Sequence, residues 1–211
     1  MNRGDNPWLH IPLGDYEAHM ALPQVAQSQL LAEIFSAQLQ RYKPRSVAVL
    51  GCAGGNGFER IDPAITERVI GVDLNASYLQ QARARYASRF ATLELIEADL
   101  QFAAVSFTPV DMIYAALILE YLNLEQAFAY FAQALNRAGM LVTVVQLPGC
   151  SLPAITPSPY TALASLSAVM HFVAPAQLRD CARLHGLHEV QCMKHSSNAA
   201  KQFAMQVFQF R

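Results

Sequence analysis

Two kinds of hydrophobic pattern alternate between residues 23 and 147. In one, apolar residues recur every three or four positions; in the other, short runs are mostly apolar. The first pattern predicts amphipathic helices, and the second predicts strands buried on both faces, as in a parallel sheet. The predicted helices are 23–43, 76–90 and 124–136, with a short helical piece at 61–65 and Gly139 capping the helix that precedes it. The predicted strands are 46–50, 68–72, 92–98, 110–116 and 140–147.

The two ends of the chain follow other patterns. Residues 1–22 mix prolines and glycines with apolar residues, so we expect an irregular segment. Residues 148–160 are rich in proline and predict a loop. Beyond them we expect a short helix at 163–170, a helix at 176–184 that ends at Gly186, and closing strands at 187–193 and 202–210. Together these elements predict an α/β fold: a doubly wound, mostly parallel seven-stranded sheet with helices on both faces and a short N-terminal cap.

Composition narrows the class of protein further. The chain has 211 residues, of which 53% are hydrophobic and 15% charged, and its formal net charge is −1. This content predicts a folded protein, and the lack of a basic block argues against nucleic acid as a partner. No apolar run reaches the roughly 18 residues of a membrane span, and the N-terminal residues lack the apolar core of a signal peptide. Four cysteines in such a length do not indicate a disulfide framework, so we expect a soluble cytoplasmic protein without a membrane partner.

A glycine-rich turn follows the first predicted strand. Residues 51–57 read Gly-Cys-Ala-Gly-Gly-Asn-Gly, and such a turn brings the backbone close to a ligand at the carboxyl end of a parallel strand. The alternative is a tight turn without a ligand. Neither the dinucleotide pattern G-x-G-x-x-G nor the P-loop pattern fits these residues, which excludes both of those phosphate sites.

Two acidic residues end the next two predicted strands. Asp73 follows 68–72, where a carboxylate can accept hydrogen bonds from ribose hydroxyls. Asp99 follows the third strand, where it can accept a hydrogen bond from an exocyclic amine such as that of adenine. The alternatives are an acid at a helix N-terminus for Asp73 and a surface turn for Asp99.

These blocks carry a resemblance to a known family. In order along the chain, GCAGGNG (51–57), GVDLN (71–75), EADL (97–100) and VDMIYAALILEYL (110–122) resemble the class I S-adenosylmethionine-dependent methyltransferases, most closely bacterial members of unassigned substrate. The resemblance spans about residues 15–210. It implies a Rossmann-like methyltransferase fold in a single domain, with an N-terminal cap and first helix (1–44), a cofactor-binding half (45–147) and an acceptor-side segment (148–211). It also implies S-adenosylmethionine as cofactor and S-adenosylhomocysteine as product.

The resemblance assigns cofactor roles residue by residue. The loop would face the methionine and ribose, Asp73 would hold the ribose hydroxyls, and Asp99 would read the adenine edge. The expected cofactor residues are Gly51, Cys52, Ala53, Gly55, Asn56, Gly57, Asp73, Leu74, Asn75, Asp99, Leu100 and Ala115. Two positions depart from the family pattern: Val49 stands where an acid is common, and Ala53 stands where the second glycine is usual.

Candidates for the acceptor side are less specific. Methyl transfer is accelerated largely by positioning, and a base is needed where the acceptor carries a proton. Glu120, Tyr121 and His171 are the catalytic candidates; the alternatives are a structural hydrogen-bond partner, a pocket wall and a packed histidine. Candidates for binding the acceptor are Tyr16, His19, Met20, Ala116 and Tyr160, the first three of which could instead only cap the sheet.

The cysteines and histidines near the C-terminus do not predict a metal site. Cys181, His185, His188 and Cys192 carry metal-binding atoms, but they are divided between a helix and the next strand and lack the close pairs of structural zinc sites. The expected function is therefore methyl transfer from S-adenosylmethionine to a small-molecule oxygen or nitrogen acceptor. One alternative is a cofactor-binding module without transfer, acting as a sensor or partner subunit. Another is a different reaction on the same cofactor, such as decarboxylation or carboxylate transfer.

Overall fold

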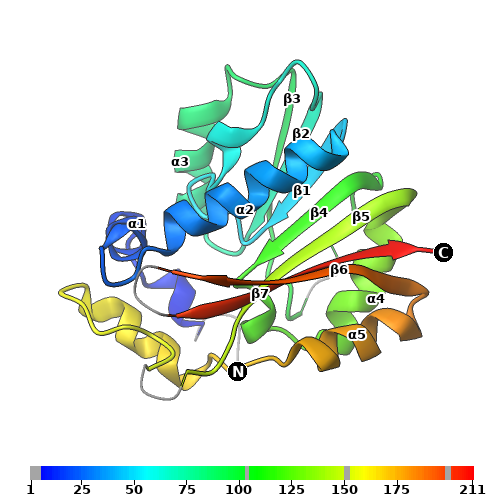
Figure 1. The fold of residues 1–211 in the computed structure, drawn as a ribbon. Coiled ribbons are helices and arrows are strands. Elements are labelled where there is room, and N and C mark those ends of the chain that lie inside the picture. Colours follow the sequence, from blue (N-terminus) through cyan, green and yellow to red (C-terminus); the bar gives the residue numbers. More distant parts are fainter. Residues whose placement is uncertain (1–5, 103–104, 150–152, 198–200) are drawn as a thin grey trace.

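One seven-stranded sheet forms the centre of the molecule (Figure 1). The structure is a computed structural model that describes residues 6–102, 105–149, 153–197 and 201–211. The strand order is β3-β2-β1-β4-β5-β7-β6; β1 to β5 pair in parallel, and β7 is antiparallel to both of its neighbours. The predicted doubly wound sheet is therefore confirmed. The strands are β1 (Ser46–Leu50), β2 (Arg68–Asp73), β3 (Thr92–Glu97), β4 (Val110–Ala116), β5 (Leu135–Gln146), β6 (Leu187–Ser196) and β7 (Gln202–Phe210).

Helices cover both faces of this sheet. Successive side chains of a strand point to opposite faces, so Val47 packs in one apolar cluster with Phe35 while Ala48 packs in the other with Phe128. The helices are α1 (Leu13–Ala21), α2 (Gln27–Tyr42), α3 (Ala76–Tyr86), α4 (Leu124–Ala134) and α5 (Pro175–Leu184). Short 3₁₀ helices are η2 (Pro7–Leu9), η3 (Phe58–Arg60), η4 (Leu119–Tyr121) and η5 (Thr161–Ala168). Within the described ranges no helix has the length and apolar character needed to cross a bilayer.

Two predictions about the N-terminal half were wrong. Residues 13–21 form the helix α1 instead of an irregular segment, because Pro12 precedes the helix and Gly14 falls in its first turn, where both are tolerated. The remaining residues of the expected cap that are described, 6–12, form η2 and its connection to α1; residues 1–5 lie outside the described part. The helical piece at 61–65 is a turn, and the short 3₁₀ helix precedes it at Phe58–Arg60.

Some predicted boundaries also moved. Gly139 lies inside β5 and does not cap a helix, because α4 ends at Ala134 and the chain enters the sheet at once. A side chain at Gly139 would lie 2.9 Å from the carbonyl oxygen of Asp111, and this close approach explains the glycine. α3 ends at Tyr86, four residues before the predicted end, and the segment predicted as a helix at 163–170 is the 3₁₀ helix η5.

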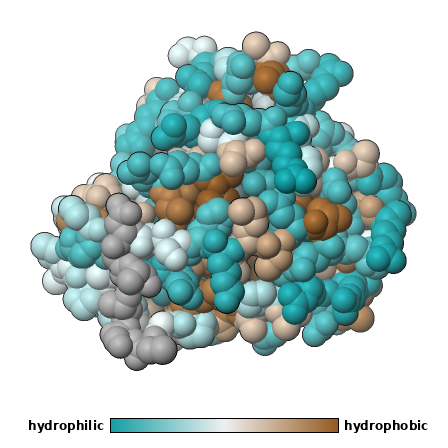
Figure 2. All heavy atoms as spheres, in the orientation of Figure 1, coloured by the Kyte–Doolittle hydropathy of each residue, from teal (hydrophilic) through white to brown (hydrophobic). Residues whose placement is uncertain are grey.

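The N-terminal segment and the segment after β5 meet at one edge of the sheet. Figure 1 shows α1 and the yellow η5 side by side where the parallel strands end. Ile11, Leu163 and Leu166 form the buried centre of a small apolar cluster there. These two segments close the carboxyl edge of the sheet. Away from it, hydrophilic residues cover most of the face seen in Figure 2, and hydrophobic residues form separate small patches.

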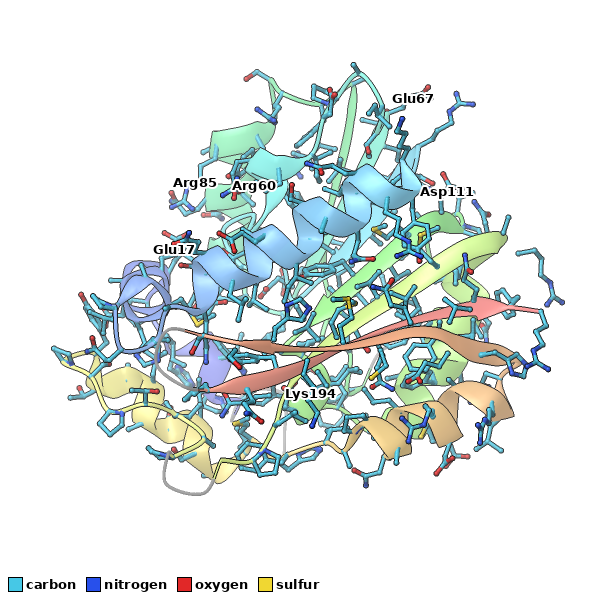
Figure 3. The ribbon with its side chains drawn as sticks, viewed as in Figure 1. Glu17, Arg60, Glu67, Arg85, Asp111 and Lys194 are labelled. Atoms are coloured by element: carbon cyan, nitrogen blue, oxygen red, sulfur yellow. The ribbon has the colours of Figure 1, made fainter. Side chains whose placement is uncertain are left out.

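At the opposite edge, Asp111 joins three segments and gives a test of the fold (Figure 3). Its carboxylate accepts hydrogen bonds from the backbone of Arg45 (3.1 Å) and Ser46 (3.0 Å), from the Ser46 hydroxyl (2.9 Å) and from the Asn136 amide (2.8 Å). We expect Asp111→Ala to lower the free energy of unfolding by about 2–4 kcal/mol in denaturant titrations, since each such bond contributes roughly 1 kcal/mol. Asp180→Ala, an exposed carboxylate on α5, should change it by less than about 0.5 kcal/mol.

The pH dependence of this effect has a definite sign. Burial by itself would raise the pKa of Asp111, but the hydrogen bonds from Asn136, Ser46 and Arg45 outweigh burial and hold the pKa below its ordinary 3.8. The stabilisation is therefore present above pH 3.8 and is lost as the pH falls through the lower pKa of the folded protein. An Asp111→Ala variant whose stability falls as steeply in acid as that of the wild type would contradict this role.

Candidate cofactor and acceptor site

The glycine loop between β1 and η3 is built on positive backbone angles. The φ angles are +68° at Gly51, +46° at Ala53, +93° at Gly55 and +82° at Gly57. The amides of Gly51 and Cys52 donate to the carbonyl oxygen of Val72 (2.8 and 3.1 Å), which fixes the loop to the end of β2. A side chain at Gly55 would come within 2.5 Å of the ring of Tyr86. Gly55 therefore meets both a conformational and a steric requirement.

Asp73 holds this loop from the end of the neighbouring strand. Its Oδ2 accepts from the amide of Ala53 (2.8 Å), and its Oδ1 accepts from the amide of Asn75 (2.9 Å) at the start of α3. Each carboxylate oxygen can accept a second bond, so Asp73 still has acceptor capacity towards the cavity. Burial raises its pKa to about 6 against the opposing effect of the backbone amides. Asp73 therefore holds the start of α3 through Asn75, and it can also accept a hydrogen bond from a ligand in the cavity.

One cavity runs along the carboxyl ends of the strands, from the residues after β3 to the residue before β7. Its walls are mainly apolar, with a few polar groups placed among them. Of the residues predicted from the sequence, Gly51, Ala53, Asp73, Leu74, Asp99, Leu100, Tyr16, His19, Met20, Ala116, Glu120 and Tyr121 line it. Unpredicted lining residues that matter below are Asn6, Trp8, Tyr78, Ile155, Leu166, Met170 and Lys201.

The N-terminal arm, residues 6–12, lies across the cofactor half of this cavity. Asn6 Nδ2 donates to Asp99 Oδ2 at 3.4 Å, and the carbonyl oxygens of Trp8 and Ile11 accept from Asn75 Nδ2 (3.0 Å) and Tyr78 Oη (2.7 Å). Asp99 is 4% exposed, and its other oxygen accepts from the amide of Gln101. The arm therefore already uses one acceptor position of the carboxylate predicted to read adenine.

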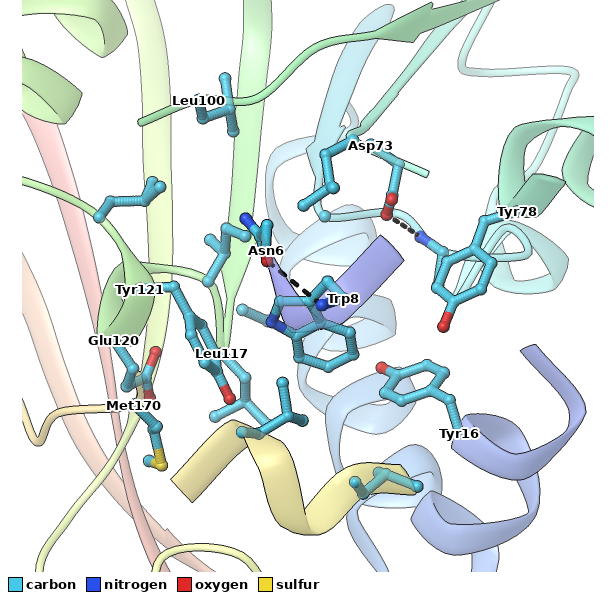
Figure 4. Close-up of a pocket in the computed structure, with 18 of the residues that line it drawn as sticks. Asn6, Trp8, Tyr16, Asp73, Tyr78, Leu100, Leu117, Glu120, Tyr121 and Met170 are labelled. Carbon is cyan, nitrogen blue, oxygen red and sulfur yellow. Dashed lines mark hydrogen bonds between the residues drawn. The ribbon is translucent and has the colours of Figure 1, made fainter. Parts of the chain in front are cut away.

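Aromatic rings surround the centre of the cavity. In Figure 4 the indole of Trp8 lies between the rings of Tyr16 and Tyr121. It meets both edge-on, with centroids 5.6 and 5.5 Å apart, and Tyr16 stacks at 6.4 Å on Tyr78. The sequence pattern drew attention to Tyr16 and Tyr121 but not to Trp8 or Tyr78. The arm is remote in sequence from the strands it covers, and a tyrosine on the helix α3 is also typical of a core residue.

Glu120 is the most unusual polar group of the cavity. It is 1% exposed, and its Oε1 accepts from the amide of Gln146 at 2.8 Å, while its Oε2 has no hydrogen-bond partner in the part of the chain that the structure describes. Burial raises its pKa to about 7, against the opposing effect of the backbone amides. A carboxyl with a pKa near neutrality can take up a proton in the physiological range. The preceding backbone is strained: Leu117, which also lines the cavity, has a φ of +55°.

A second cavity lies on the other side of the glycine loop. Gly55, Asn56 and Gly57 line it together with Val49 and Tyr16. Asn56 donates to the hydroxyl of Tyr16 at 2.9 Å. At its rim Arg85 and Glu17 form an ion pair at 2.5 Å (Figure 3). Val49, which stands where an acidic residue is common in the family it resembles, is 3% exposed and packs in an apolar cluster. Its surroundings therefore suit an apolar side chain.

The other predicted residues lie outside both cavities. Cys52, Asn75 and Ala115 are buried beside the loop and the strand ends, Tyr160 packs in the apolar cluster of α1 and η5, and His171 is exposed. The His171 amide donates to the carbonyl oxygen of Glu120 at 3.1 Å, so its backbone contacts the site although the residue is exposed and does not line either cavity. Among the described residues no group of three or more His, Cys, Asp or Glu side chains is arranged to hold a metal ion.

Comparison with known proteins gives the class. Residues 47–139 match the family described as a methyltransferase domain. The fold, the glycine loop and the acids after β2 and β3 agree with this match, and the resemblance to class I S-adenosylmethionine-dependent methyltransferases is confirmed. Residues 47–139 therefore form a methyltransferase domain, on the fold of the class I S-adenosylmethionine-dependent methyltransferases, which indicates an enzyme that uses S-adenosylmethionine. No protein of curated function matches the chain.

Solved structures with this fold catalyse several reactions. The N-methyltransferase NodS from Bradyrhizobium japonicum WM9, in complex with S-adenosyl-l-homocysteine, is 17% identical over 87% of each chain with a TM-score of 0.65. The geranyl diphosphate C-methyltransferase from Streptomyces coelicolor A3(2) is 12% identical over 85% of this chain and 77% of that one, with a TM-score of 0.63. The [4+2]-cyclase SpnF is 12% identical over 88% and 82%, with a TM-score of 0.65. At these identities the likeness shows the fold, and the acceptor must be argued from the site.

Proposed function

We propose that this enzyme transfers the methyl group of S-adenosylmethionine to a nitrogen or oxygen of a small molecule, with Glu120 taking the proton that the acceptor loses. The observation that carries the proposal is the buried, unpartnered Oε2 of Glu120 in the wall of the cavity. Methylation of a carbon needs a proton acceptor such as Glu120 only where the C–H is acidic. An N–H or O–H would donate to Oε2 and satisfy it.

The cofactor half fits the adenosine portion of S-adenosylmethionine. Asp73 has acceptor capacity for the ribose hydroxyls, Asp99 lies beyond the next strand for the adenine edge, and the loop at Gly51 brings the backbone close. When bound, the cofactor supplies an electrophilic methyl group on a sulfonium. The chain's own residues bind and orient the two partners, the arm and η5 exclude water, and Glu120 Oε2 holds the proton.

Calorimetric titration tests the two halves of the proposal separately. We expect S-adenosylmethionine and S-adenosylhomocysteine each to bind at one site per chain with micromolar affinity. The protein is then incubated with S-adenosylmethionine and small amines, phenols and carbon acids, and S-adenosylhomocysteine is quantified. Product from amines or phenols supports the proposal, and product from carbon acids only contradicts it. Binding of the cofactor by a folded protein that yields no product with any acceptor would favour the module without transfer.

A further inference from the structure

A buried lysine lies at the far end of the cavity from the cofactor half. Lys201 precedes β7, is 4% exposed and lines the cavity. Four strand spacings of about 4.8 Å separate β7 from β2, which places its strand roughly 19 Å from that of Asp73. Burial of the ammonium lowers its pKa to about 8, so it is still mostly charged at pH 7.

The described residues give the Lys201 ammonium few hydrogen bonds and no counter-charge. Among the described residues, Lys201 Nζ donates a single hydrogen bond, to the carbonyl oxygen of Ala154 at 2.7 Å, and an ammonium has three hydrogens to donate. In the described ranges no carboxylate lies within the 4.0 Å of an ion pair with Lys201. A buried charge without a counter-charge is costly, and a bound anion would remove most of that cost.

Holding the loop after β5 does not explain the lysine. The carbonyl oxygen of Ala154 already accepts from the neutral amide of Gln146 at 3.1 Å. That bond fixes the loop without placing a charge in the cavity.

The surroundings define the rest of the ligand. His19 also lines this end, is 4% exposed, and lies at 2.9 Å from the hydroxyl of Ser158. Burial and then the charge of Lys201 lower the pKa of His19, so its ring is neutral and can donate or accept a hydrogen bond. The cavity that Lys201 shares with Glu120 has mainly apolar walls, to which Ile155, Leu166 and Met170 contribute.

We propose that Lys201, assisted by His19, binds a carboxylate of the methyl acceptor, so that the acceptor is a small organic acid with an apolar body and a separate N–H or O–H at Glu120. This inference rests on the proposed function and adds the substrate class. A carboxylate could also come from the methionine portion of the cofactor, and the experiment distinguishes the two sources.

Trp8 is the single tryptophan of the chain and lies in the cavity, so its fluorescence reports binding directly. With S-adenosylhomocysteine saturating, the protein is titrated with benzoate, 4-hydroxybenzoate and cyclohexanecarboxylate and with the three matching amides. We expect the wild type to bind the acids at least tenfold more tightly than the amides. Lys201→Met should bring this ratio to about 1, while Lys194→Met, an exposed lysine on β6, should leave it unchanged.

Three results would overturn the inference. They are a wild type that does not prefer the acids, a preference that survives in Lys201→Met, and an S-adenosylhomocysteine affinity that falls more than tenfold in Lys201→Met. The third result would mean that Lys201 binds the carboxylate of the cofactor's methionine portion instead of the acceptor. Thermal melting shows that the variant is folded. Failure of the wild type to bind S-adenosylhomocysteine at all is a different result, since it contradicts the proposed function.

Discussion

Glu120→Gln should slow methyl transfer at least 100-fold at pH 7.5 and leave the dissociation constant of S-adenosylhomocysteine within about threefold. The variant keeps the shape of the side chain and an oxygen to accept from the Gln146 amide, but it cannot take up a proton. Proton transfer by a positioned group contributes roughly 10²–10⁴-fold to rate. Turnover is measured as S-adenosylhomocysteine formed with the acceptor found by screening.

The same substitution should make the protein relatively more stable as the pH rises. In the folded protein the pKa of Glu120 is raised by burial from 4.5 to about 7, so the folded state favours the protonated carboxyl. Below pH 4.5 the carboxyl is protonated in both states, so its raised pKa does not lower the free energy of unfolding. As the pH rises from 4.5 to 7, the free energy of unfolding of the wild type falls by about 3 kcal/mol, since a tenfold change in proton affinity is 1.4 kcal/mol. In Glu120→Gln this fall in the free energy of unfolding should be absent. Denaturant titrations of both proteins at pH 4.5 and 7.5 measure the difference.

The two readouts separate a catalytic from a structural role. A structural carboxylate would lose activity and stability together on substitution. Wild-type kcat/KM should rise with an apparent pKa near 7, and this limb should vanish in Glu120→Gln. Glu125→Gln, an exposed acid in the first turn of α4, serves as the matched control and should change neither readout. Unchanged turnover in Glu120→Gln would refute the proton-acceptor role.

Asp73→Ala should weaken S-adenosylmethionine binding by about 1.5–3 kcal/mol, a loss of roughly 10- to 150-fold in affinity. The substitution removes the acceptor for ribose hydroxyls and also frees the amides of Ala53 and Asn75 that the carboxylate holds. Calorimetry measures the dissociation constant. Glu97→Ala is the matched control, because Glu97 lies in register with Asp73 on β3, is exposed and does not line the cavity.

The affinity should also depend on pH. The pKa of Asp73 is raised to about 6 by burial, so a tenth of the carboxyl groups are ionised at pH 5. Because the ionised form is the stronger acceptor for hydroxyl groups, the wild type should bind S-adenosylmethionine up to tenfold more weakly at pH 5 than at pH 7.5. Asp73→Ala should lack this dependence. Equal affinity of wild type and Asp73→Ala would refute the ribose assignment.

The periodicity of the chain determined most of the fold. Runs that are apolar at nearly every position, such as 47–50 and 112–116, are typical of strands buried on both faces between two layers of helices, and they predict the parallel sheet. The positions of Asp73 and Asp99 also followed from the sequence, because residues just after parallel strands meet at one edge of the sheet. The sequence pattern misled where a residue is required by a contact with a distant segment. Gly139 was predicted to cap a helix, but it lies in β5, where its missing side chain makes room for the carbonyl group of Asp111 on β4.

By itself, then, the sequence determined the order of helices and strands and the sheet edge at which the candidate site lies, since these depend on near neighbours along the chain. The methyltransferase class came from the resemblance of its motifs to a known family. The tertiary structure decided which side chains meet above that edge. Trp8 lines the cavity from the N-terminal arm, Glu120 is buried in its wall, and Lys201 lines it from the residue before β7. Burial and the absence of a partner depend on contacts between segments far apart in the chain. Those contacts, acting on a carboxylate and an ammonium, give Glu120 and Lys201 their proposed roles.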